Sequence, residues 1–163
     1  MIRRPPRSTQ GVSSAASDVY TRQNKGIIIV DHGSRKSESN EMLEDVARLF
    51  YEKFSSKYSI VEPAHMELSE PSISTAYSRC VEKGADFIVI CPFFLGPGKH
   101  WTYDIPHLAN EASKHFPNTN YHVAMPLGVD DLILELIEKR LTSCTHNEFK
   151  CPSCEGTRRA GNS

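Results

Sequence analysis

Two histidines stand just beyond apolar runs of the sequence, and each has a glycine close by. His32 follows the run "IIIV" and precedes Gly33, while His100 ends the stretch "PFFLGPGKH" that follows "FIVIC". Glu67 and Glu70 come near the end of a third extended stretch. Imidazole and carboxylate groups together suit a divalent first-row metal, and an imidazole alone can act as a general base. The alternative is that each histidine is an ordinary hydrogen-bonding residue at the end of a strand.

The stretch "PFFLGPGKHW" at residues 92–101 has the character of a flexible apolar loop. It lacks the spacing G-x-x-x-x-G-K-[ST], and no G-x-G-x-x-G follows the first apolar run, so a phosphate cradle is not expected. Apolar and aromatic side chains on such a loop suit a large planar ligand, although ordinary packing also explains them. These side chains are Phe93, Phe94, Leu95 and Trp101.

Three cysteines near the end of the chain form the array C-x6-C-x2-C, made by Cys144, Cys151 and Cys154. Thiolates at this spacing favour zinc or an iron–sulfur cluster. Three ligands are incomplete for either, so His146, another cysteine or a second chain would have to complete the set. A redox-active C-x-x-C pair and a disordered tail are the alternatives.

Short apolar runs alternate with segments of helical periodicity along residues 25–142. The pattern predicts strands at 27–30, 58–68, 87–91 and 121–127. It predicts amphipathic helices at 38–56, 71–83 and 102–115 and from Asp130 onward. Pro63 indicates that the second strand is irregular or lies at a sheet edge.

This order of elements predicts an α/β fold with a four-stranded parallel sheet and helices on both faces. In such sheets ligands sit beyond the carboxyl ends of the strands. His32, Glu67, Glu70 and His100 all follow strands, so the sequence predicts one site at this rim.

Charge divides the chain into a basic head and an acidic body. Residues 1–25 carry five basic side chains and one acidic, whereas the remainder has 14 basic and 19 acidic groups, a net charge of −5. An acidic body argues against nucleic acid as a partner, and no apolar run is long enough to cross a bilayer. We therefore expect a head at 1–24, one domain at 25–142 and a cysteine-bearing tail at 143–163. The head, expected to be disordered, is either the remnant of a transit peptide or a non-native read-through of adapter sequence, and the absence of an amphipathic stripe favours the latter.

Three motifs in order resemble the short class II chelatases of the CbiX and SirB type. They are "DHGSR" after the first strand, "ELSEPSI" after the second and "PFFLGPGKHWTYDIP" after the third. The resemblance covers residues 26–141 and implies a single chelatase-like, flavodoxin-like domain. The cysteine-bearing tail resembles the plant members of this family, whose tail is associated with a [2Fe–2S] cluster.

The resemblance implies insertion of Fe²⁺ into sirohydrochlorin to give sirohaem, in the plastid stroma and by a homodimer. His32 and His100 match the metal-handling histidines of the family, and Glu67 and Glu70 match its acidic motif. The substrate's carboxylates would meet basic side chains, and the loop would cover its planar face. The expected substrate contacts are Ser34, Arg35, Phe94, Gly96, Gly98 and Lys99.

Three other functions remain open from the sequence. His and carboxylate ligands separate Fe²⁺ from Co²⁺ only weakly, so a cobaltochelatase is one rival, and only the plant-like tail favours iron. A carrier of metal or tetrapyrrole would bind one equivalent without turnover. A redox-regulated interaction module would act through Cys151 and Cys154.

Overall fold

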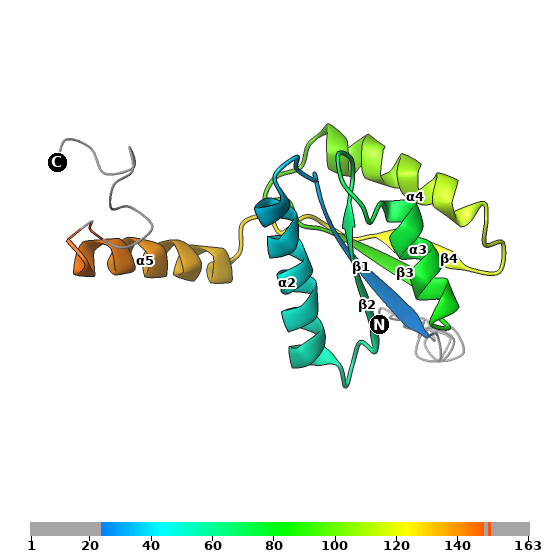
Figure 1. The fold of residues 1–163 in the computed structure, drawn as a ribbon, viewed down its shortest axis with the longest axis horizontal. Helices are drawn as coiled ribbons and strands as arrows, with labels where there is room; N and C mark the ends of the chain where they lie inside the picture. The colour runs from blue at the N-terminus through cyan, green and yellow to red at the C-terminus, as the bar shows by residue number, and fades with distance from the viewer. Residues whose placement is uncertain (1–23, 149, 151–163) are drawn as a thin grey trace, which may run out of the picture.

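The computed structural model describes residues 24–148 and 150, and it contains one four-stranded parallel sheet in the order β2-β1-β3-β4 (Figure 1). The predicted α/β class is therefore confirmed. Pro63 lies on β2, which is an edge strand, as its missing N–H requires. The strands are β1 Lys25–Asp31, β2 Ile60–His65, β3 Phe87–Pro92 and β4 Asn120–Val123.

Five helical elements accompany the sheet, and helices cover both of its faces, as predicted. They are α2 Ser37–Phe54, α3 Ile73–Glu82, the π-helical turn η1 His100–Asp104, α4 Ile105–Ser113 and α5 Asp131–His146. The helix expected at 102–115 thus begins as a π-turn at His100. None of the helices in the described part of the chain is long and apolar enough to cross a membrane.

The central strand β1 is buried from both sides, which explains its run of β-branched residues. Ile27 and Ile29 pack with Leu43 of α2 on one face of the sheet. Ile28 and Val30 pack on the other face in a larger core that α3 and α4 help to build. The alternation of side chains along the strand thus joins the two halves of the core.

The start of α3 differs from the expectation that Pro71 is its first residue. Ser72 is the N-cap, because its hydroxyl accepts a hydrogen bond from the Thr75 amide at 3.3 Å, and the helix begins at Ile73. The proline therefore precedes the cap, where it leads the chain from β2 into the helix.

The last helix, α5, is capped as predicted by Asp130, whose carboxylate accepts a hydrogen bond from the Leu132 amide at 2.9 Å. Its apolar side chains do not join the core, because no residue of α5 is buried. Figure 1 shows α5 standing apart from the sheet, beyond α2. Of the expected head only Asn24 is described, and of the expected tail only residues 143–148 and 150, so Cys151 and Cys154 lie outside the described residues.

Candidate active site

The carboxyl ends of β1, β2 and β3 bring His32, Glu67 and His100 to one place at the rim. Nε2 of His32 lies 2.8 Å from Oε1 of Glu67. The rings of His32 and His100 meet edge to face, with their centroids 5.1 Å apart. All three side chains are roughly half exposed, so a ligand can reach them from solvent. The structure therefore places together three of the four residues proposed for the chemistry.

His100 is held by a carboxylate on its own turn. Its Nδ1 lies 2.8 Å from Oδ2 of Asp104, four residues later, and both side chains belong to the π-turn η1. Single π-turns are frequent at functional sites. This contact engages Nδ1 of His100 and leaves its Nε2 as the ring nitrogen that could bind a ligand. Phe94 stacks beside the same imidazole, with ring centroids 6.1 Å apart.

An open hollow of about 420 Å³ adjoins these residues. Lys99 lines this hollow, and its Nζ lies 4.0 Å from Oδ1 of Asp104. His107, on α4, also lines the hollow. Sequence reasoning missed several lining residues. The sequence did contain a pattern that could have identified Asp104 and His107. They come four and seven residues after His100, so all three side chains would lie on one face of a helix. The lining residues that were missed are Met66, Asp104, His107 and Leu108.

Glu70 has a different environment from Glu67. Its carboxylate accepts hydrogen bonds from the Ser72 amide at 2.7 Å and from the Thr75 hydroxyl at 2.9 Å. The bond from the Ser72 backbone, followed by that from Thr75, lowers the pKa of Glu70 below its ordinary value. The carboxylate of Glu70 is therefore bound to the start of α3, whereas the carboxylate of Glu67 lies beside His32.

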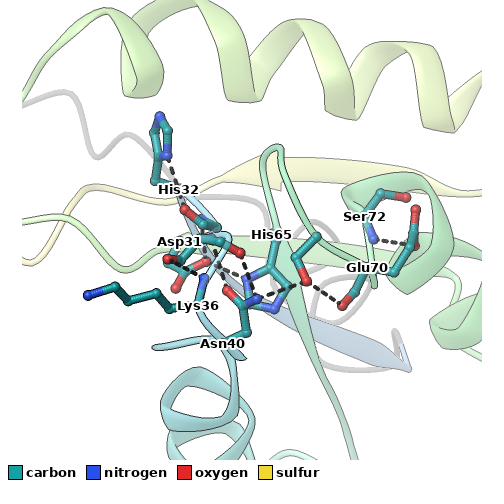
Figure 2. A network of polar contacts seen from close by, with 10 residues as sticks. Asp31, His32, Lys36, Asn40, His65, Glu70 and Ser72 are labelled. Atoms are coloured by element: carbon teal, nitrogen blue, oxygen red, sulfur yellow. Dashed lines mark hydrogen bonds and ion pairs between the residues drawn. The ribbon is translucent and has the colours of Figure 1, made fainter. Parts of the chain in front are cut away.

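A buried pair lies beneath the rim. The His65 side chain is fully buried, and its Nδ1 lies 2.6 Å from Oδ1 of Asp31. The same oxygen accepts a hydrogen bond from the Gly33 amide at 2.9 Å. Figure 2 shows His32 pointing away from this pair, although it is the residue next to Asp31. The pair thus fixes the backbone from which His32 projects.

Gly33 is required at its position by both conformation and space. Its φ is +88°, and an added Cβ would overlap the carbonyl oxygen of Glu67. The loop after β1 therefore lies directly against the loop after β2. Asn40 of α2 ties the same two loops together, because its Nδ2 donates to the Ser34 carbonyl at 2.9 Å and to the Ser69 hydroxyl at 3.0 Å (Figure 2).

The other expected substrate contacts lie around this rim. The Ser34 hydroxyl accepts a hydrogen bond from the Lys36 amide at 3.1 Å, and Arg35 is exposed. Gly96 and Gly98 are exposed, and no heavy atom lies within 4 Å of a Cβ built on either. The loop between β3 and η1 is therefore open on the side where a planar ligand is expected.

Among residues 24–148 and 150, no three His, Cys, Asp or Glu side chains are positioned to hold one ion together. Cys144 is partly exposed on α5, and its two proposed partners lie outside the described residues. Burial raises the pKa of the Cys80 thiol to about 12 and also raises that of Cys91, so both resist forming thiolates.

Comparison with known proteins relates the chain to chelatases in both sequence and fold. The chain is 51% identical to the chloroplastic sirohydrochlorin ferrochelatase of Arabidopsis thaliana, over 81% of this chain and 60% of that protein. It is 31% identical to the sirohydrochlorin cobaltochelatase of Sulfolobus acidocaldarius, over 81% of this chain and 96% of that protein. It also superimposes on the structure of SirB from Bacillus subtilis with Fe³⁺ at a TM-score of 0.62 and 27% identity, over 74% of this chain and 47% of SirB.

The chain spans less than two thirds of some relatives, 60% of the Arabidopsis protein among them. The model of the CbiX family matches residues 26–144, which include all of the sheet except Lys25 and nearly all of α5. The archaeal match extends over almost the entire length of that relative. On these grounds, the chain belongs to the CbiX family.

Proposed function

We propose that this protein is a sirohydrochlorin ferrochelatase, which inserts Fe²⁺ into sirohydrochlorin and yields sirohaem and two protons. The observation that carries the proposal is the meeting of His32, Glu67 and His100 beside an open hollow. Its 51% identity to the Arabidopsis ferrochelatase supports the choice of substrate and metal. Iron is a substrate in this reaction.

Metal insertion makes three demands that these residues can meet. Fe²⁺ must lose water ligands, and Nε2 of His100 can replace one of them while Asp104 keeps the proton on Nδ1. His32 can take a second position when the ion displaces Glu67 from its Nε2. Two pyrrolic protons must then leave the macrocycle, and Glu67 or a neutral imidazole can accept them.

The substrate side of the proposal rests on the loops around the hollow. Phe94 and the open stretch with Gly96 and Gly98 would cover the planar face of the tetrapyrrole and exclude water. Lys99 and Arg35 are exposed cations and would bind its carboxylates, with Ser34 beside them. Glu70 would act by fixing the loop after β2, since its carboxylate accepts hydrogen bonds from Ser72 and Thr75 at the start of α3.

The test is an anaerobic assay with excess sirohydrochlorin and Fe²⁺, followed by absorption. We expect many turnovers from the parent, and loss of at least about 100-fold in His100→Ala, because one ligand is removed. His115→Ala is the control, since His115 lies after α4 and is exposed. One equivalent of product from parent and variant alike would identify a carrier and overturn the proposal.

A cobaltochelatase is the second candidate, because the archaeal relative carries that name and imidazole and carboxylate bind Co²⁺ as readily as Fe²⁺. The same assay with each metal at equal free concentration separates the two candidates. A higher kcat/KM with Co²⁺ would reverse the assignment.

We also propose that Cys144, Cys151 and Cys154 hold a [2Fe–2S] cluster. The partial exposure of Cys144 near the end of α5 fits this proposal, and His146 or a second chain would supply the fourth ligand. Iron and sulfide analysis with electron paramagnetic resonance of the reduced protein tests it, and Cys151→Ser with Cys154→Ser should abolish the signal. We place the protein in the plastid stroma and as a homodimer, and the chloroplastic name of the Arabidopsis relative supports the location.

A further inference from the structure

The hollow beside the candidate site is lined by two histidines, His100 and His107. His107 belongs to α4 and comes about two helical turns after His100, with which η1 begins. It is exposed, so a molecule in the hollow and the surrounding water can both reach its ring. His107 thus adds an imidazole to the place where the metal and the macrocycle would meet.

His107 differs from the other groups around the hollow in having free ring nitrogens. Oε1 of Glu67 lies 2.8 Å from Nε2 of His32. Oδ2 of Asp104 lies 2.8 Å from Nδ1 of His100. In the part of the chain that the structure describes, by contrast, neither nitrogen of His107 has a hydrogen-bond partner. A neutral imidazole in this condition has a lone pair that is ready to accept a proton.

The ring of His107 is nevertheless held in place. It stacks on the ring of Tyr103, with centroids 6.0 Å apart and an angle of 8° between the planes. Tyr103 belongs to η1, the same turn that carries His100. Such a stack fixes the plane of the imidazole through its face and leaves both nitrogens at the ring edge available.

The proposed reaction needs two proton acceptors at this place. Two N–H bonds of the macrocycle break, and each electron pair stays on its nitrogen and binds the metal. If His32 and His100 bind the ion through Nε2, these lone pairs are not available for protons. Glu67, once displaced from His32, accepts one proton. Lys99 also lines the hollow, but its ammonium group has no lone pair and accepts none.

We propose that His107 is the second proton acceptor of the insertion reaction. A proton moves from a pyrrolic nitrogen to a ring nitrogen of His107, which becomes an imidazolium. Because the side chain is exposed, the imidazolium then passes the proton to water, and the neutral base is restored for the next turnover. This inference rests on the proposed chelatase function and names the group that completes its proton balance.

Steady-state kinetics of His107→Phe test the proposal. Phenylalanine keeps a ring that can stack on Tyr103 but removes both nitrogens, so we expect kcat to fall at least about 100-fold. The KM values for Fe²⁺ and for sirohydrochlorin should stay at those of the parent, because His107 accepts a proton and binds neither substrate in the ground state. His115→Phe is the matched control, since it makes the same change at an exposed position after α4 and should keep the kcat of the parent.

Chemical rescue separates proton transfer from a merely structural role. His107→Ala opens space at the exposed side of the hollow, where a small base can take the place of the missing ring. Added 2-methylimidazole, at a fixed concentration of free Fe²⁺, should raise the kcat of His107→Ala at least about tenfold. The same base should leave the kcat of His115→Ala unchanged. Far-ultraviolet circular dichroism of each variant confirms that the fold persists.

The outcomes distinguish this inference from the proposed function. A parent that turns over many times, with His107→Phe at the same kcat, would overturn the role of His107 and leave the chelatase assignment in place. A rise in KM for sirohydrochlorin alone would make His107 an anchor for a substrate carboxylate, and a rise in KM for Fe²⁺ alone would make it a metal ligand. Either result contradicts the proposal, as does a His107→Ala variant that no base rescues. A parent without turnover would overturn both assignments.

Discussion

Asp31 holds His65 beneath the candidate site through a contact of 2.6 Å between Oδ1 and Nδ1, while the imidazole is fully buried. Nε2 of His65 has no hydrogen-bond partner in the described part of the chain. One nitrogen of this ring is thus already unsatisfied, and Asp31 satisfies the other. The pair contributes to the shape of the loop that carries His32.

Replacing Asp31 should therefore destabilise the fold. We expect Asp31→Ala to lower the free energy of unfolding by about 2 kcal/mol, because it leaves a second buried nitrogen unpaired. Asp31→Asn should cost less, since the amide oxygen can still accept from His65 and Gly33. Urea denaturation measures both. If Asp31→Ala costs the same in a His65→Leu background, the contact is not the cause.

Asp104 should act by positioning His100. Asp104→Asn keeps the size of the side chain but weakens its hold on the Nδ1 proton, so Nε2 presents its lone pair to the metal less often. Loss of such a carboxylate partner typically costs about 10- to 100-fold in metal affinity or activity.

The measurement is the dependence of the insertion rate on Fe²⁺ concentration, and we expect the effect mainly in KM for the metal. Glu111→Gln on α4 is the control, because it also removes an exposed carboxylate, one paired with Lys114. Equal kinetics for Asp104→Asn and the control would exclude the positioning role.

Glu70 should stabilise the protein in a pH-dependent way. Hydrogen bonds from Ser72 and Thr75 lower its pKa in the folded protein below the ordinary value of 4.5. Its contribution is therefore full above about pH 4.5 and is lost as the pH falls through the folded pKa. Glu70→Gln should lower the free energy of unfolding at pH 7 by at most about 1 kcal/mol, as for an exposed helix cap.

Urea unfolding of Glu70→Gln and the parent across acidic pH measures this effect, and the two curves should converge at low pH. Glu67→Gln is the matched control, because Glu67 is exposed at the rim and does not cap α3. A difference that grows toward low pH would contradict the prediction.

Gly33 should not tolerate a side chain. In Gly33→Ala the new methyl group would overlap the Glu67 carbonyl, and the φ of +88° disfavours alanine. We expect a loss of more than about 1 kcal/mol in the free energy of unfolding and a lower insertion rate, because the loops of His32 and Glu67 would separate. Gly98→Ala, where a Cβ meets open space, should keep the stability of the parent. Thermal unfolding compares the two variants.

The order of strands and helices was readable from the sequence, because local periodicity reflects which faces are buried. The run at 27–30 is apolar at every position, and β1 is indeed buried on both faces. His32, Glu67 and His100 were placed at one rim for a general reason. The carboxyl ends of parallel strands share an edge, whatever the packing.

The tertiary structure decided which neighbours meet across that edge. Glu67 and Glu70 are only three residues apart in one short segment of the sequence. In the fold, Glu67 faces His32, whereas Glu70 accepts hydrogen bonds at the start of α3. The Asp31–His65 pair joins residues 34 positions apart, a distance that no local pattern encodes. Helix α5 shows the same limit, because periodicity identifies an apolar stripe but does not say what covers it. Those outcomes depend on loop paths and long-range packing, which arise only when the whole chain has folded.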